Sequence, residues 1–221
     1  MLTPVMRLAR TQTGITTYAL TSFAKNAVKN WNLIMTDILA IDPGTTKSGW
    51  VFMVNGKPVD HGWFDNEKIY TLLKMYQCVV VIEDVGHYGM PVGRDVFETI
   101  RWTGRFDYLA TEICKLKLVY MKRADVKLHL CFSPRANDST VRQAIIDKYG
   151  GDQVAIGGKK CVACKGKGWA GVGRPPCLEC NQTGYETPPG PLKGISGHVW
   201  AALGVGLTYY DSLTNPDETP M

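Results

Sequence analysis

The chain has 221 residues, of which 45% are hydrophobic and 20% charged, as is typical of a globular protein with one sizeable core. No apolar run approaches the ~18 residues that a membrane-spanning helix needs, so we expect no membrane partner. The formal net charge is +5, but residues 115–193 alone hold 14 lysines and arginines against 6 acidic residues. This basic region favours a polyanionic partner, nucleic acid above all, although a plain solvated surface would carry the same charge.

The N-terminal residues 1–36 carry four basic side chains and no acidic one. This composition fits a disordered extension, a start site misassigned ahead of Met35 or a targeting segment, and we favour the first two. At the other end, residues 213–221 are polar and contain proline, which predicts a disordered tail.

Between these ends, short apolar runs alternate with segments of helical periodicity. The predicted strands are 37–42, 50–54, 59–64, 78–84 and 116–121. The predicted helices are 66–76, 92–114, 123–131, 138–149 and 197–210. Because short turns join the first three strands, this order predicts an α/β domain with a mixed sheet. The domain would consist of residues 37–150 and 190–212, interrupted by an insertion at 151–189.

Two acidic side chains stand at the ends of predicted strands. Asp42 follows the run DILAI, and Glu83 follows the run VVVI. Ligands of α/β sheets gather at the carboxyl ends of strands, so the two carboxylates would meet if their strands are neighbours. Together they suit Mg²⁺, which prefers oxygen ligands from carboxylates, water and substrate phosphates. The alternative is that Asp42 caps a turn and Glu83 pairs with a surface lysine.

Five segments resemble, in the same order, motifs of the RuvC-type Holliday junction resolvases of bacteriophages, members of the RNase H-like superfamily. They are ILAIDPGTTKSGW, VVVIEDV, KRADVKLHL, ANDSTVRQAIIDKYG and GISGHVWAALGVGLTYY, and GMPVGRDVFETIRWTGRF is also similar. The match spans about residues 37–149 and 190–210. It implies an RNase H-like fold with a mixed five-stranded sheet flanked by helices. It also implies a homodimeric endonuclease that hydrolyses phosphodiester bonds of Holliday junctions or other branched DNA, using Mg²⁺ or Mn²⁺, in the cytoplasm of a host cell.

Site residues follow from this resemblance position by position. Asp42 and Glu83 match metal-binding carboxylates of the family. His198 falls where the closing helix supplies a third group, and we expect a metal ligand or an acid/base there rather than a histidine bonded only to backbone. A further acid of that helix is replaced by Ala201, which cannot bind a metal.

Basic side chains around the last predicted strand are candidates for phosphate contacts, which position DNA without reading its sequence. Lys127 matches a lysine of the family, and Arg123, Arg135 and Arg142 lie near it in the sequence. Three apolar or aromatic residues could wedge between bases at a branch point, although packing in a core or an interface is their commoner role: Tyr88, Met90 and Phe97.

Four of the seven cysteines form two CxxC pairs, Cys161/Cys164 and Cys177/Cys180, separated by 12 residues. Both pairs continue alike, as CVACKGKG and CLECNQTG, which is similar to the CxxCxGxG repeat of DnaJ-type zinc modules. Four thiolates at this spacing predict a structural zinc site, with an iron site as the alternative. The odd number of cysteines favours a reducing compartment over a disulfide framework.

The cysteine insertion is also basic, through Lys159, Lys160, Lys165, Lys167 and Arg174. We therefore expect a zinc-stabilised arm that contacts DNA. The alternatives are a purely structural clip and a knob that docks onto another protein.

Three functions remain open from the sequence. The first is a structure-selective endonuclease on branched DNA, and the second is a related nuclease on flaps or RNA–DNA hybrids. The third is a junction-binding protein whose catalytic set has decayed, which the alanine at position 201 keeps open. Asp138 and Asp125 are the acids that could substitute for the missing one.

Overall fold

The computed structural model of the chain describes residues 37–86, 92–169 and 176–214. The predictions for the N-terminal extension, for Tyr88 and Met90, and for most of the tail lie outside these described residues. All described elements belong to one compact unit, Met35–Met221. None of its described helices is long and apolar enough to cross a membrane.

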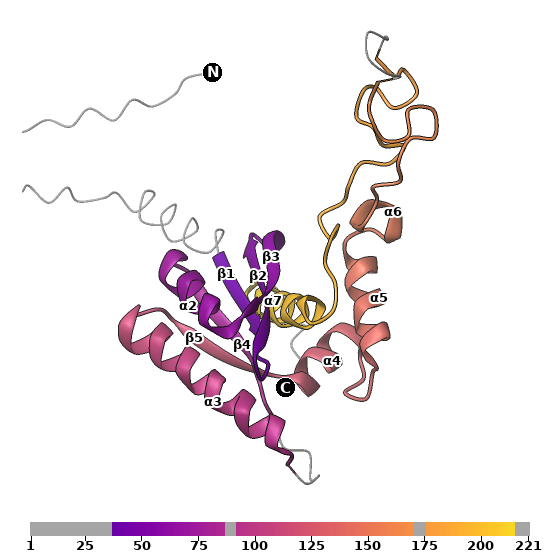
Figure 1. Cartoon of the computed structure of the whole chain (residues 1–221). Coiled ribbons are helices and arrows are strands. Elements are labelled where there is room, and N and C mark those ends of the chain that lie inside the picture. Colours follow the sequence, from indigo (N-terminus) through magenta and orange to yellow (C-terminus); the bar gives the residue numbers. More distant parts are fainter. Residues whose placement is uncertain (1–36, 87–91, 170–175, 215–221) are drawn as a thin grey trace, which may run out of the picture. The chain divides into compact units, whose positions relative to one another are not determined.

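A mixed five-stranded sheet in the order β3-β2-β1-β4-β5 forms the centre of this unit (Figure 1). β2 pairs antiparallel with both β1 and β3, whereas β4 pairs parallel with both β1 and β5. The strands are β1 (Asp37–Asp42), β2 (Lys47–Val54), β3 (Lys57–Asp65), β4 (Val79–Asp84) and β5 (Leu118–Lys122). The predicted mixed five-stranded sheet is therefore confirmed.

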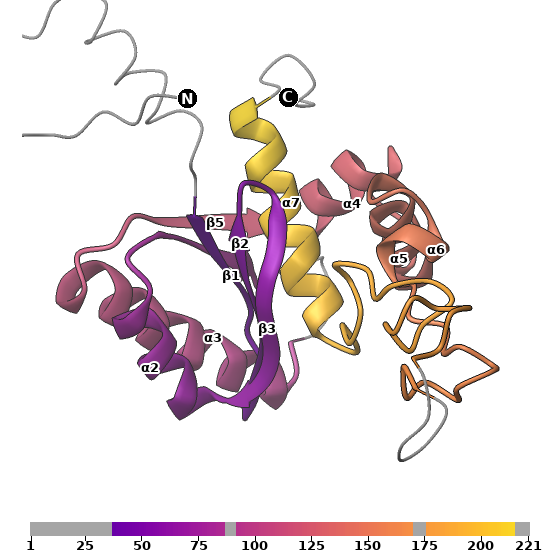
Figure 2. The same cartoon turned by 90° about the horizontal axis from the view of Figure 1, so that it is seen from above.

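Helices cover both faces of the sheet. They are α2 (Asn66–Met75), α3 (Arg94–Tyr108), the π-helical turn η1 (Leu109–Ile113), α4 (Arg123–Cys131), α5 (Asp138–Lys148), α6 (Asp152–Ala155) and α7 (Val199–Thr214). Figure 2 shows α2 and α3 on one side of the sheet, and α7 with α4 and α5 on the other. The result is a three-layered α/β domain.

The central strand β1 is buried on both faces because its side chains alternate between two hydrophobic clusters. Ile38 and Ala40 belong to the cluster that includes α7. Leu39 and Ile41 belong to the cluster that includes α2 and α3. Burial of each large aliphatic side chain contributes roughly 1.5–3 kcal/mol, so the strand is firmly held up to its last residue. That residue is Asp42, whose place is thereby determined.

Helix α7 packs closely on β1 and β2 because its residues are small where it meets them. A Cβ atom at Gly206 would lie 2.5 Å from the sulfur of Met53 and 3.0 Å from the Cβ of Ala40. This close approach explains why an apolar helix of the sequence contains glycine in its middle. It also determines where the residue before the helix, His198, stands relative to the sheet.

Some element boundaries differ from the predictions because tertiary contacts extend or distort local patterns. β2 begins at Lys47 rather than at residue 50, since Lys47 and Ser48 continue its pairing with β3. The predicted helix 92–114 begins at Arg94, and its last turn is π-helical. α7 continues to Thr214, so residues 213–214 are helical rather than part of the tail.

The cysteine insertion leaves the core and returns to it through two paired segments. Ala155 of α6, a helix that the sequence did not predict, is buried in the same cluster as Leu192. Between them, an isolated bridge joins Gly157 to Pro189. The chain therefore leaves the core slightly later than the predicted boundary at residue 151.

Candidate functional site

The parallel pairing of β1 with β4 brings two carboxylates to one end of the sheet. Ile41 lies opposite Ile82, so Asp42 and Glu83 follow at neighbouring places. Their side chains are only 15% and 14% exposed, respectively. The two acids that end apolar runs in the sequence are thus side by side and largely shielded from water.

His198 joins this pair from the start of α7. Its Nδ1 atom lies 3.2 Å from Oδ2 of Asp42, while the side chain remains 69% exposed. The approach depends on Gly49 of β2, because a Cβ atom there would lie 2.6 Å from the backbone oxygen of His198. An imidazole held by a carboxylate and open to solvent can ligate a metal or carry a proton.

Arg123, at the start of α4, bridges two acids. Its Nη1 donates to Oε2 of Glu83 at 3.0 Å, and its Nη2 donates to Oδ1 of Asp138 at 2.7 Å. The Nζ atom of Lys127 lies 3.8 Å from the same oxygen of Asp138. Arg123 was predicted to contact DNA phosphates, and in the structure its side chain lines the acidic cavity.

Burial and mutual repulsion oppose full ionisation of the two shielded acids. Burial, followed by the charge of Asp42, raises the pKa of Glu83 to about 7, while Arg123 acts in the opposite direction. Burial likewise raises the pKa of Asp42, against the lowering effect of His198 and Arg123. The exposed Asp138 differs, since its hydrogen bond from Arg123 lowers its pKa. A cation placed between the buried carboxylates would relieve their repulsion.

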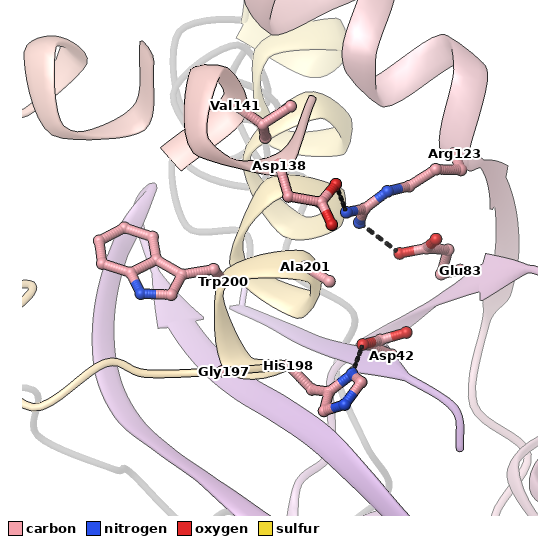
Figure 3. A pocket seen from close by; sticks show the side chains of 9 residues that line it. All are labelled: Asp42, Glu83, Arg123, Asp138, Val141, Gly197, His198, Trp200 and Ala201. Carbon is pink, nitrogen blue, oxygen red and sulfur yellow. Dashed lines mark hydrogen bonds and ion pairs between the residues drawn. The ribbon is translucent and has the colours of Figure 1, made fainter. Parts of the chain in front are cut away.

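These side chains line one cavity of about 470 Å³ (Figure 3). Ala201 lines it as well, one helical turn after His198, and contributes no ligand atom. The cavity is therefore acidic on the side of β1 and β4, while α5 and α7 form its other walls. Its lining residues are Asp42, Glu83, Arg123, Asp138, Val141, Gly197, His198, Trp200 and Ala201.

The donor set of the cavity suits a hard divalent cation. Asp42 and Glu83 offer carboxylate oxygens and His198 offers a ring nitrogen. The guanidinium of Arg123 already places positive charge against Glu83. Within the described part of the chain, only the cysteine cluster has three or more ligand atoms all within 4.8 Å of one another. The ligand atoms of the acidic site are therefore spaced more widely than those of the cysteine cluster.

Asp138 is a lining residue of the cavity that was predicted only as a substitute acid. It was one of two substitutes for the acid missing at Ala201, and the structure separates them. Asp138 lines the cavity, whereas Asp125 is exposed on α4 and does not. A local signal was present, because Asn137 caps α5 by accepting the backbone N–H of Thr140 at 2.8 Å. This cap determines where the first residue of the helix stands.

The other basic residues of the α/β domain that were predicted to contact DNA lie at different distances from the cavity. Lys127 lies beside it, through its contact with Asp138. Arg142 of α5 places its guanidinium 4.9 Å from the ring centroid of Trp200, which lines the cavity. Arg135 is exposed in the turn between α4 and α5 and is not a lining residue.

The four cysteines of the insertion form a second cluster, with all Sγ atoms within 4.8 Å of one another. The sulfurs of Cys161 and Cys177 are 3.9 Å apart, and those of Cys164 and Cys180 are 3.7 Å apart. A tetrahedral site with Zn–S distances of about 2.3 Å separates its sulfurs by about 3.8 Å. A disulfide requires only about 2.05 Å. This cluster could therefore bind a metal such as zinc.

The two CxxC halves repeat each other in structure as they do in sequence. The backbone N–H of Gly168 donates to the sulfur of Cys164, and that of Gly184 donates to the sulfur of Cys180, each at 3.3 Å. Both glycines have positive φ, +75° and +80°, which lets the backbone turn around the sulfurs. Such donors stabilise thiolates, the form of cysteine that binds metals.

The lysines of the insertion are all exposed, as a contact surface requires. Lys159 pairs with Glu186 at 2.6 Å. The others, Lys160, Lys165 and Lys167, have no ion pair with another described residue. Arg174 lies outside the part of the chain that the structure describes.

Comparison with known proteins establishes the fold. No protein-family model and no curated protein matches the sequence. Among solved structures, the Thermus thermophilus RuvC structure matches with a TM-score of 0.50 and 12% identity, over 81% of this chain and 96% of that one. T. thermophilus RuvC in complex with Holliday junction substrate matches with a TM-score of 0.49 and 11% identity, over the same shares. The chain has a RuvC-like, RNase H-like fold, which confirms the predicted fold class.

Proposed function

We propose that the chain is a metal-dependent endonuclease that hydrolyses phosphodiester bonds of branched DNA, in particular four-way Holliday junctions. The observation that carries this proposal is the cavity in which Asp42, Glu83 and His198 meet. The RuvC-like fold supports a nuclease. The RuvC-type motifs of the sequence support branched DNA as the substrate and the cytoplasm of a phage host as the place of action.

Asp42 and Glu83 would hold Mg²⁺ or Mn²⁺, with His198 as a further ligand or as an acid/base. When bound, such an ion lowers the pKa of water for attack on phosphorus and offsets the charge that develops on the phosphate. Arg123 and Lys127 keep cationic donors beside these carboxylates. Such donors can hold the phosphates that flank the bond to be cut, together with Arg142 and Arg135 farther out.

We assign structural zinc to the cluster Cys161, Cys164, Cys177 and Cys180, because all four ligands come from the protein and all are buried. The exposed lysines around it support a role as a DNA-contacting arm. Outside the cluster, the described thiols of Cys78, Cys114 and Cys131 are free. Free thiols together with a thiolate metal site fit a reducing compartment.

The exposed face of α3 supports the proposal of a homodimer. Phe97, Ile100 and Tyr108 are exposed at helical spacing, and Gly104 between them has nothing near the place of a Cβ atom. An apolar stripe with a gap in its middle can receive the same helix of a second copy in a symmetric interface. Light scattering that gave the mass of a monomer at micromolar concentration would contradict this part of the proposal.

The nuclease proposal is tested by cleavage of four synthetic substrates of matched sequence: a four-way junction, a flap, an RNA–DNA hybrid and a linear duplex. We expect paired, symmetric nicks in the junction with Mg²⁺ or Mn²⁺. Asp42→Asn, which keeps the size of the side chain, should abolish cutting while leaving DNA binding in place. Cutting of only flaps or hybrids would reject the junction as substrate and indicate a related nuclease.

One observation favours a second candidate function, a junction-binding protein without nuclease activity. Ala201 lines the cavity where the resemblance places an acid, so one potential ligand is absent. Tight binding of the junction without cutting under any metal would favour this second function over the first.

A further inference from the structure

An exposed tryptophan stands beside the acidic cavity on the edge strand β3. Trp63 is 53% exposed and belongs to neither hydrophobic cluster of the sheet. Its ring stacks on that of His198, with the centroids 6.0 Å apart and the planes at 21°. The same imidazole reaches Asp42 with its Nδ1 atom at 3.2 Å. Trp63 is therefore separated from a candidate catalytic carboxylate by a single aromatic ring.

The neighbouring strand β2 determines the surroundings of this ring. Gly49 lies opposite Trp63 in the register, so no side chain at that position comes between the indole and the start of α7. Lys47, on the same face of β2, places its Nζ atom 5.0 Å from the ring centroid of Trp63. The same Nζ lies 3.5 Å from Asp65. A flat apolar ring and a positive charge thus stand together at the rim of the cavity.

We propose that Trp63 is a stacking platform for a nucleobase next to the bond that is cut, and that it favours DNA in which this base has lost a stacking neighbour. This inference rests on the proposed function and assigns it a specificity-determining residue. An indole accepts any base, because every base offers a π-face and stacking reads no hydrogen-bond pattern. Lys47 supplies a cation for a phosphate of the same strand.

The preference for branched DNA follows from base stacking, which is already complete inside a linear duplex. Inside a linear duplex each base stacks on two neighbours, so none offers a free face to Trp63. At a branch point a base can lose one neighbour, and its face becomes available. Stacking on Trp63 then adds binding free energy for the branched substrate alone, while phosphate contacts serve both kinds of DNA.

The experiment measures binding in an Asp42→Asn background, with zinc retained, so that cutting cannot interfere. A four-way junction carrying 2-aminopurine at the branch is compared with a linear duplex of the same sequence. Trp63→Ala removes the platform, Trp63→Phe keeps an aromatic ring, and Phe132→Ala removes an exposed aromatic residue that does not line the cavity. Circular dichroism confirms that each variant is folded.

We expect Trp63→Ala to weaken junction binding by roughly fivefold to a hundredfold, the usual effect of losing one base–aromatic stack. Duplex binding should not change, and 2-aminopurine should be quenched by the parent protein but not by Trp63→Ala. Trp63→Phe should retain most of the affinity, and Phe132→Ala all of it. Unchanged junction binding by Trp63→Ala, or an equal loss for junction and duplex, would overturn the inference.

Two further results distinguish this inference from a positioning role of Trp63 and from the nuclease proposal. If Trp63→Ala, in a protein that keeps Asp42, lowers only the cleavage rate at saturating junction, Trp63 positions His198 and does not bind a base. If the protein cuts no substrate yet Trp63→Ala still loses junction binding selectively, the nuclease proposal fails while the platform stands.

Discussion

At the scale of single residues, Ala201 is where the cavity departs most clearly from the resemblance. It follows His198 by one turn of α7 and lines the same cavity as Asp42. Asp138 contributes an acid from the start of α5, but Arg123 and Lys127 both contact it there. The wall formed by α7 therefore offers an imidazole and no carboxylate.

Ala201→Asp should strengthen the binding of Mn²⁺ by about tenfold, which corresponds to about 1.4 kcal/mol. The reason is that it adds a carboxylate to a cavity already lined by Asp42 and Glu83. Isothermal titration calorimetry on the zinc-loaded protein measures this affinity. Ala201→Asn is the matched control, since it has the same shape without the charge. Equal Mn²⁺ affinity of the two variants would mean that no ion binds at the α7 wall.

At the scale of elements, the contact of α7 with the sheet determines the site. The helix lies so close to β1 and β2 that Gly206 has no room for a Cβ atom between Met53 and Ala40. At Gly204, by contrast, the nearest side-chain atom would lie 3.3 Å from the added Cβ, on Val126. Because His198 directly precedes α7, a shift of the helix would move the imidazole away from Asp42.

Gly206→Ala should lower the free energy of unfolding by about 1–3 kcal/mol, the usual cost of overpacking a core. Gly204→Ala is the control, because its milder contacts are offset by the gain of about 1 kcal/mol from replacing glycine in a helix. Urea unfolding followed by circular dichroism compares the two variants. A Gly206→Ala protein as stable as the control would show that α7 can move away from the sheet without cost.

At the scale of the whole molecule, the RuvC-like α/β domain and the cysteine insertion have separate cores. The four cysteines form a cluster of their own, which shares no residue with the two clusters of the sheet. The N–H···S bonds within each half are local as well. Metal loss should therefore unfold the insertion while the three-layered body remains folded.

Cys161→Ser with Cys164→Ser should abolish zinc binding, which we expect at one ion per chain, measured by atomic absorption. The helical circular dichroism signal should persist, because the body keeps its core. Junction binding should weaken and become less dependent on salt, since the insertion carries exposed lysines. Cys114→Ser with Cys131→Ser is the control, as both thiols lie outside the cluster. Unchanged junction binding after zinc loss would reject the DNA-contacting arm.

Features of the fold and the site could be predicted where a short stretch of sequence determines them, and not where contacts between distant elements do. The strands that carry Asp42 as the last residue and Glu83 as the last but one could be predicted, because apolar runs between turn residues carry their own signal. The cysteine cluster could be predicted from the CxxC spacing alone. The Asn137 cap could indicate that Asp138 begins a helix, but not that Asp138 lines the cavity, which depends on how α5 packs against α7 and on the guanidinium of Arg123. Trp63 carried no signal in the sequence, since nothing local indicates that its ring meets His198.

The sequence by itself therefore determined the α/β class, the two acids at the strand ends and the thiolate cluster, all of which follow from short-range patterns. Only the tertiary structure decided which groups, besides the expected His198, share the cavity with those acids. β1 and β4 are distant in sequence from α4, α5 and α7, and their meeting depends on the burial of apolar surface on both faces of the sheet. That burial acts over the whole domain, so only the folded chain could place Arg123 and Asp138 in the cavity beside Asp42.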